Sequence, residues 1–234
     1  MSERSRSIVE FYVVANRLKE TIRSGPRAWG ISAERLESVA EHVFGAQMLA
    51  IAVVSEYEME VDLMKVVKML AAHELAEAVI GDITPGCGVP SDVKYEMEIE
   101  AVDAIVGRLM IGEELRGLFV EFEENETAEA RFCNQIDKLE AAMQVKIWDE
   151  MGLCDFETPR TGFLEERRQE SVEKGWGSLS EYWIGRGIED GTYEGAFLEL
   201  AEYVRGNDIS EARRGMIVED RRGEREKFER GYEE

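Results

Sequence analysis

Cysteine and histidine are both scarce in this sequence. Among its 234 residues there are three cysteines and two histidines. Cys87, Cys133 and Cys154 stand singly and form no Cys-x-x-Cys pair, which argues against a disulfide framework and against a cysteine zinc site. The candidate metal-binding and catalytic residues are therefore the two histidines and the carboxylates around them.

Long apolar segments are also absent. The longest apolar run lies within 46–54 and is interrupted by Gln47, far short of the roughly 20 residues that a membrane-spanning helix needs. The N-terminal residues MSERSRSIVE lack the apolar core of a signal peptide. With 33% charged residues, the sequence favours a soluble protein, and we expect a cytoplasmic location and no membrane partner.

Basic residues are outnumbered by acidic ones. The chain has 28 Lys and Arg against 50 Asp and Glu, a formal net charge of −22. Such a field repels a nucleic-acid backbone, so we expect no binding to polymeric nucleic acid. A small phosphate ligand stays compatible with this charge, because a bound divalent cation would reverse the field inside a pocket.

Apolar residues recur at the spacing of amphipathic helices, and no run of period-two alternation is found. We therefore predict an all-α fold. Gly25-Pro26 and Gly81 are expected to follow the ends of two of the helices. The predicted helices cover 7–23, 37–57, 61–81, 92–110, 113–124, 127–151 and, after a weaker stretch, 192–206.

We expect a single domain, because 44% hydrophobic residues suffice for one core. No segment differs in composition from the rest in a way that indicates a second folded domain. Residues 1–152 are predicted to form the core of the fold. Residues 153–234 are expected to be an accessory helical and charged segment, which either belongs to the same domain or forms a tail.

The helix expected over 61–81 ends in a group of polar residues. Its apolar stripe continues at the same spacing to Glu74 and Glu77, with His73 beside them. A buried ionised carboxylate is costly unless it is paired or binds a metal. On an ideal helix His73 and Glu77 project side by side, while Glu74 is rotated by about a quarter of a turn. His73 and Glu74 can therefore approach one cation from adjacent directions.

Other interpretations of these residues stay open at this point. The carboxylates can form an ion-pair network with neighbouring Lys or Arg, and His42 by itself can be a core histidine bonded to a backbone carbonyl. The segment HELAE is not the His-Glu-x-x-His zinc motif, because its fifth residue is Glu77. The spacing around Asp137 is ambiguous.

Three segments in order carry a resemblance to a known family: ESVAEH (37–42), HELAEAVIGDI (73–83) and EARFCNQIDKLE (129–140). Together they resemble the motifs of the HD-domain phosphohydrolases, specifically the 5′-deoxynucleotidase branch, over about residues 7–150. Three linked motifs are far more specific than one. The resemblance implies an HD-domain helical bundle with a C-terminal helical extension, and a homodimer.

The resemblance also implies roles for individual residues. The metal ligands would be His42, His73, Glu74 and Asp137. The acidic pair that activates or orients the attacking water and handles the proton of the leaving group would be Glu77 and Asp82. The side chains that contact phosphate, sugar or base would be Arg27, Trp29 and Lys94, although Ala28 separates the first two here.

Glu74 departs from the family, which has aspartate there. Its extra methylene moves the carboxylate by about 1.5 Å, which is large against metal–ligand distances near 2 Å. A shifted helix, a bidentate mode or a changed metal preference would absorb the difference. Mixed nitrogen and oxygen ligands suit one divalent transition metal, namely Mn, Co, Fe, Ni or Zn.

We therefore expect a metal-dependent phosphoric monoester hydrolase that removes the 5′-phosphate from deoxynucleoside monophosphates. One alternative is a deoxynucleoside triphosphate triphosphohydrolase, which shares the ligands and differs in the phosphates that the pocket accepts. The other is a non-catalytic nucleotide-binding or scaffold protein that lost its metal through Glu74.

Overall fold

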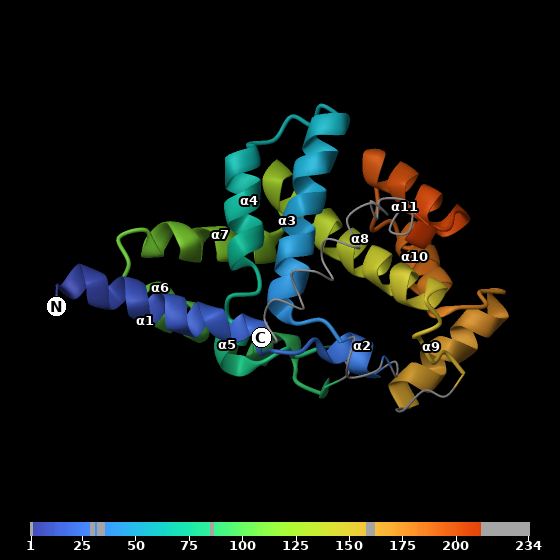
Figure 1. The fold of residues 1–234 in the computed structure, drawn as a ribbon, viewed down its shortest axis with the longest axis horizontal. Helices are drawn as coiled ribbons and strands as arrows, with labels where there is room; N and C mark the ends of the chain where they lie inside the picture. The colour runs from blue at the N-terminus through green and yellow to red at the C-terminus, as the bar shows by residue number, and fades with distance from the viewer. Residues whose placement is uncertain (1, 29–30, 32–35, 85–86, 158–161, 212–234) are drawn as a thin grey trace, which may run out of the picture.

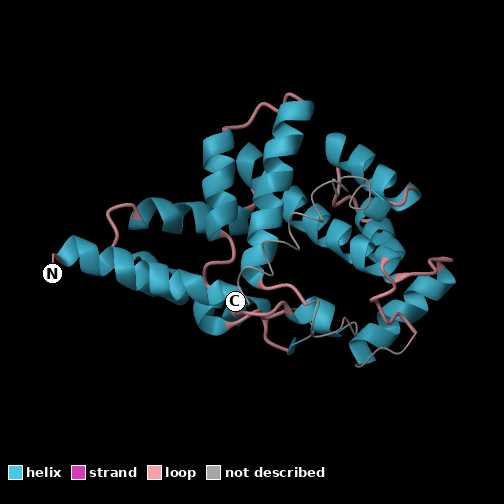
Figure 2. Cartoon of the chain, in the orientation of Figure 1, coloured by secondary structure: helices cyan, strands magenta, loops and turns pink. Residues whose placement is uncertain are grey.

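The structure is a computed structural model that describes residues 2–28, 31, 36–84, 87–157 and 162–211. Across these residues the regular structure is helical, and the only β-type pairing is an isolated bridge between Ile22 and Ser38 (Figure 2). The all-α fold predicted from the sequence is confirmed. The helices are α1 (Glu3–Ala15), the 3₁₀ helix η1 (Asn16–Lys19), α2 (Ser24–Ala28), α3 (Val39–Glu56), α4 (Leu63–Ala72), α5 (Glu77–Ile80), α6 (Ser91–Val106), α7 (Gly112–Glu124), α8 (Ala128–Glu150), α9 (Gly162–Glu173), α10 (Leu179–Glu189) and α11 (Ala196–Gly206).

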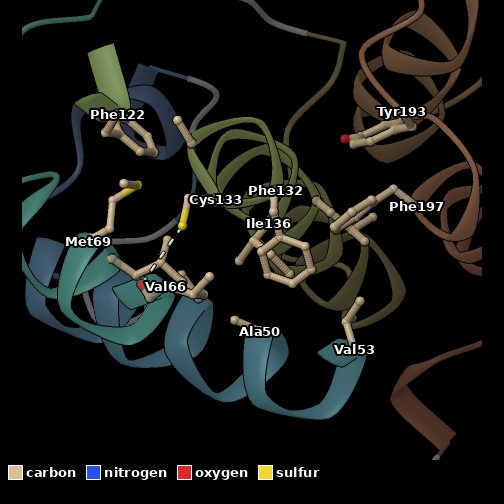
Figure 3. Packing of buried hydrophobic residues seen from close by; sticks show 14 of the residues in the cluster. Ala50, Val53, Val66, Met69, Phe122, Phe132, Cys133, Ile136, Tyr193 and Phe197 are labelled. Carbon is tan, nitrogen blue, oxygen red and sulfur yellow. Dashed lines mark hydrogen bonds between the residues drawn. The ribbon is translucent and has the colours of Figure 1, made fainter. Parts of the chain in front are cut away.

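The long helix α8 is the centre of the packing. It contacts α3, α4 and α7 as well as α10 and α11 (Figure 1). In the main core Ile136 and Cys133 of α8 lie between Ala50 of α3, Val66 of α4 and Phe197 of α11 (Figure 3). Burying each large apolar side chain contributes about 1.5–3 kcal/mol. This core fixes α3, which carries His42, and α4, which is followed directly by His73, against α8.

Side-chain caps determine where α3 and α8 begin. At the start of α3, Ser38 Oγ accepts from the N–H of Glu41, while the Glu41 carboxylate accepts from the N–H of Ser38 at 2.6 Å. At the start of α8, Thr127 Oγ1 accepts from the N–H of Ala130 at 3.1 Å. Caps of this kind contribute about 1 kcal/mol each. They thereby fix which residues of each helix face its neighbours.

The continuous helix predicted over 61–81 is wrong. α4 ends at Ala72, and 73–76 form a turn before α5. The N–H groups of Leu75 and Glu77 bond to carbonyls three residues back instead of four, which tightens the chain. The side chains at 73–77 therefore lie at a junction between two helices, where ideal helical spacing does not apply.

The helix predicted over 7–23 is too long. α1 ends at Ala15 and η1 at Lys19. Gly25 and Pro26, which were expected to follow a helix end, instead lie inside the short α2. Proline is accepted there because the first turn of a helix needs no N–H donor from it.

The sequence prediction lacks α9 and α10. In α10 the glycines at 185 and 187 lower helix propensity. Tertiary packing explains both: a Cβ at Gly185 would lie 2.7 Å from the ring of Trp176, and a Cβ at Gly187 would lie 2.5 Å from the ring of Tyr193. Close ring packing at these two positions joins α10 to its neighbours, and Tyr193 lies in the same core as α8 and α11 (Figure 3).

Among the described residues, α3 is the one helix long and apolar enough to cross a membrane by length and composition. Its inner face, with Ala46 and Ala50, is fully buried against the neighbouring helices. Phe44 and Met48 on its other face are exposed.

Candidate metal centre and cavity

His42 joins α3 to α8 through both ring nitrogens. Its Nε2 lies 2.9 Å from Asp137 Oδ1, and its Nδ1 lies 2.5 Å from Glu140 Oε2, one turn further along α8. The ring is fully buried. The core interpretation of His42, in which it bonds to a backbone carbonyl, does not match this geometry, because both partners are carboxylates.

His73 presents one nitrogen without a partner. Its Nδ1 lies 2.8 Å from the carbonyl oxygen of Leu70, and a carbonyl only accepts, so Nδ1 carries the proton. In the neutral ring Nε2 then carries a lone pair and can only accept. This atom is buried and has no hydrogen-bond partner among the residues that the structure describes, although Glu74 Oε1 lies 3.7 Å away and Asp137 Oδ1 3.8 Å away. A buried acceptor without a partner is rare, and a cation would satisfy it.

The four predicted ligands come together. One ligand atom from each of His42, His73, Glu74 and Asp137 lies within 4.8 Å of the other three. Ligands about 2.0–2.2 Å from a shared ion lie roughly 3–4 Å from one another, which matches the separations around the unpartnered nitrogen. The extra methylene of Glu74 does not remove its carboxylate from the group. The donor set of two imidazoles and two carboxylates therefore fits one divalent cation.

Electrostatics in this cluster favour positive charge. Burial lowers the pKa of His42, but hydrogen bonds to Asp137 and Glu140 outweigh it and raise the pKa to about 9. Burial raises the pKa of Asp137, but the hydrogen bond from His42 outweighs it and holds the pKa well below its usual value. Asp137 thus stays ionised, and a proton on His42 Nε2 faces the region in which a metal ion would bind.

Glu140 is a residue of this site to which the sequence analysis gave no role. It orients His42 from the side opposite Asp137, as an outer carboxylate does for a metal-binding imidazole. Gly45 makes room for it, because a Cβ there would lie 3.0 Å from Glu140 Cδ and closer still to Oε1. The signal was its position three residues after Asp137, which places both on one face of a helix.

Glu77 and Asp82 lie beside the cluster. Burial, followed by the charges of Glu74 and Asp82, raises the pKa of Glu77 to about 10. Asp82 Oδ2 accepts from the N–H of Ser24 at 2.6 Å and from its hydroxyl at 3.2 Å. Asp82 therefore also fixes the first residue of α2.

A cavity of about 600 Å³ opens beside the cluster, and its wall is formed by carboxylate, cationic and apolar side chains. Lys94 lines it and is paired with Glu98 at 2.6 Å. Arg27 is exposed and is not among the lining residues, whereas Arg23, half-buried and 3.4 Å from Glu37, lines the wall. Arg23 was missed because its place depends on the chain turning between η1 and α2. Trp29 lies outside the described residues.

The sequence is similar to those of known proteins. The sequence matches the family described as HD domain over residues 15–179. It is 31% identical over 179 residues to a 5′-deoxynucleotidase of Schizosaccharomyces pombe, covering 74% of this chain and 88% of that protein. It is 29% identical over 150 residues to a human 5′-deoxynucleotidase, covering 63% of this chain and 71% of that one.

Solved structures share the fold. A conserved hypothetical protein of Pyrococcus furiosus superposes with a TM-score of 0.60 at 23% identity, over 85% of this chain and 99% of that one. A protein of Magnetospirillum magnetotacticum, described as a predicted metal-dependent phosphohydrolase, gives a TM-score of 0.56 at 24% identity, over 83% of this chain and all of that one (100%).

Proposed function

Since this chain belongs to the HD-domain family, we propose that it is a metal-dependent phosphohydrolase that removes the 5′-phosphate of deoxynucleoside monophosphates. The observation that carries the proposal is the unpartnered Nε2 of His73, which faces the half-buried carboxylates of Asp137 and Glu74. Relatives named 5′-deoxynucleotidases support the substrate.

The metal would be held by His42, His73, Glu74 and Asp137. When bound, a divalent transition ion supplies a Lewis acid and makes water acidic enough to act as a nucleophile near neutral pH. Mixed nitrogen and oxygen ligation favours Mn, Fe, Co, Ni or Zn for this role. Glu140 holds the His42 ring in place through Nδ1, so that Nε2 faces the other ligands.

The cations of the cavity would bind the phosphate. Arg23 and Lys94 both line the wall, and each is already paired with one carboxylate, Glu37 and Glu98 respectively. These carboxylates hold the cations in position, and the guanidinium and the ammonium each keep further N–H donors for phosphate oxygens. A guanidinium and an ammonium thus draw an anion into an otherwise acidic cavity.

Glu77 would move the proton. Its raised pKa means that the buried carboxyl can hold a proton near neutral pH and donate it to the leaving oxygen of the sugar. A cation held by Glu74 would lower the pKa of Glu77 and so bring it closer to neutral pH. Asp82, held by Ser24, supplies a fixed negative charge beside Glu77.

The proposal is tested with purified protein loaded with each metal in turn and offered deoxynucleoside mono- and triphosphates. The expected product is orthophosphate from the monophosphates. His73→Ala should remove most of the bound metal and the activity and leave helical content unchanged. Tripolyphosphate release from triphosphates alone, or full activity of His73→Ala, would contradict the proposal. A metal-free wild type in which only Glu74→Asp is active would identify a scaffold protein.

A further inference from the structure

The cavity changes character along α8. Six residues on one face of this helix line it, from Asp137 at the metal centre to Trp148 eleven positions later, a distance of about 16 Å at 1.5 Å per residue. Near Asp137 the wall is charged. Further along α8 it is formed by Ala141, Ala142 and Val145. A ligand with a charged end and an apolar end therefore has one orientation in this cavity.

α10 forms the opposite wall and runs antiparallel to α8. At one end the N–H of Ser180 donates to Asp149 Oδ2 at 2.5 Å, and past the other end the Tyr193 hydroxyl donates to the carbonyl of Lys138 at 3.2 Å. Trp183, one turn into α10, therefore lies opposite the apolar part of α8. Measured along the axis of α8 by the helical rise, its level is on the order of 12 Å from that of Asp137, comparable to the length of an extended nucleoside monophosphate.

Trp183 differs from the other described tryptophans. It lines the cavity and is 42% exposed, whereas Trp148 and Trp176 are 4% and 5% exposed. Its ring packs edge-on against the buried Tyr182, with centroids 5.6 Å apart and planes at 74°. That contact holds the indole from one side, and the exposed part of the ring adjoins the cavity, where it offers a surface to a flat π-system. The small Ala141 and Ala142 opposite leave room for it.

We propose that Trp183 is the platform on which the nucleobase of the substrate stacks, so that α10 of the C-terminal segment provides the base subsite. This inference rests on the proposed function for the position of the phosphate. Stacking on an indole face tolerates every base, because each has a π-face. The enzyme should therefore accept all four deoxynucleotides and discriminate against a sugar phosphate without a base.

The test compares Trp183→Ala, Trp183→Phe and wild type on deoxyadenosine 5′-monophosphate and on 2-deoxyribose 5-phosphate. Losing a stacking platform weakens binding by roughly tenfold. We expect Trp183→Ala to raise KM for the nucleotide about tenfold with kcat unchanged, and to leave KM for the sugar phosphate as it was. Trp183→Phe should restore most of the affinity. Tyr203→Ala, which removes an exposed aromatic ring on α11 outside the cavity lining, is the matched control and should change neither.

Equal losses on both substrates, or no loss on either, would overturn the inference. Calorimetric titration of the metal-loaded protein with the same two ligands separates this result from the proposed function. If no nucleotide is hydrolysed but the wild type binds deoxyadenosine 5′-monophosphate about tenfold more tightly than Trp183→Ala does, the proposed function fails and the base subsite stands. Wild-type binding no tighter for the nucleotide than for 2-deoxyribose 5-phosphate refutes the subsite.

Discussion

Gly45→Ala should weaken metal binding although residue 45 touches no ligand atom of the metal. Gly45 lies in α3, and a Cβ there would lie 3.0 Å from Glu140 Cδ and closer to Oε1. The Glu140 side chain would have to move, and its hydrogen bond to His42 Nδ1 would be lost. His42 would then keep only Asp137 to orient its ring.

The substitution should change both the metal affinity and the folding stability of the protein. Loss of an outer carboxylate costs 10–100-fold in metal affinity, or about 1.4–2.7 kcal/mol. Alanine in place of glycine inside a helix favours folding by about 1 kcal/mol. Loss of the Glu140–His42 hydrogen bond opposes this gain by about 1.5–3 kcal/mol. Gly45→Ala should therefore lower the stability of the metal-free protein by no more than about 2 kcal/mol and lower its metal affinity by at least tenfold.

The assay is a competition titration of metal against a chromophoric chelator, with thermal unfolding measured in parallel in excess chelator. Gly117→Ala in α7 is the matched control, because a Cβ there meets nothing within 4 Å. It should raise stability and leave metal affinity unchanged. In a Glu140→Ala background, Gly45→Ala should cause no further loss of affinity. Wild-type affinity in Gly45→Ala with Glu140 intact would refute the coupling from Gly45 through Glu140 to His42.

Three further variants test other parts of the structure. Lys94→Ala should lower kcat/KM about 10–100-fold by removing a charged phosphate contact. Lys68→Ala breaks an exposed pair of the same 2.6 Å length outside the cavity lining and should leave kcat/KM unchanged. Equal effects of the two substitutions would remove Lys94 from the site. Glu77→Gln should keep the metal and slow turnover by roughly 10²–10⁴-fold in single-turnover assays. In chelator-treated protein the pKa of Glu77 is raised in the folded state, so the folded state holds a proton that the unfolded state releases, and the free energy of unfolding falls as pH rises from about 4.5 towards about 10. Chemical unfolding at several pH values should show a smaller slope of stability against pH in Glu77→Gln than in wild type. An unchanged slope would contradict this role of Glu77. Gly187→Ala should lower the free energy of unfolding by about 1–3 kcal/mol, because its Cβ meets the Tyr193 ring; a gain in stability would show that the ring can move.

The sequence predicted which side chains come together better than it predicted the path of the chain that carries them. Two histidines in the whole chain, with acidic neighbours and three ordered motifs, were enough to select His42, His73, Glu74 and Asp137. The turn at 73–76 was not predictable from apolar spacing, because the stripe continues through it.

Long-range packing explains the rest of what was missed. Glu140 can reach His42 because Gly45, far away in the sequence, leaves space for its carboxylate. α10 was missed because Gly185 and Gly187 suggest a loop until the rings that fill their space are known. Arg23 lines the cavity, in contrast to Arg27, because of the bend before α2.

The most direct test is to locate the ion by anomalous X-ray scattering from crystals grown with manganese or cobalt. The four proposed ligands predict one peak within about 2.0–2.3 Å of His73 Nε2 and in contact with His42, Glu74 and Asp137. Glu37, His42 and Glu140 form a second group of donors on the other side of the same imidazole. A peak there, or an ordered site without a peak and with His73 Nε2 unengaged, would contradict the account.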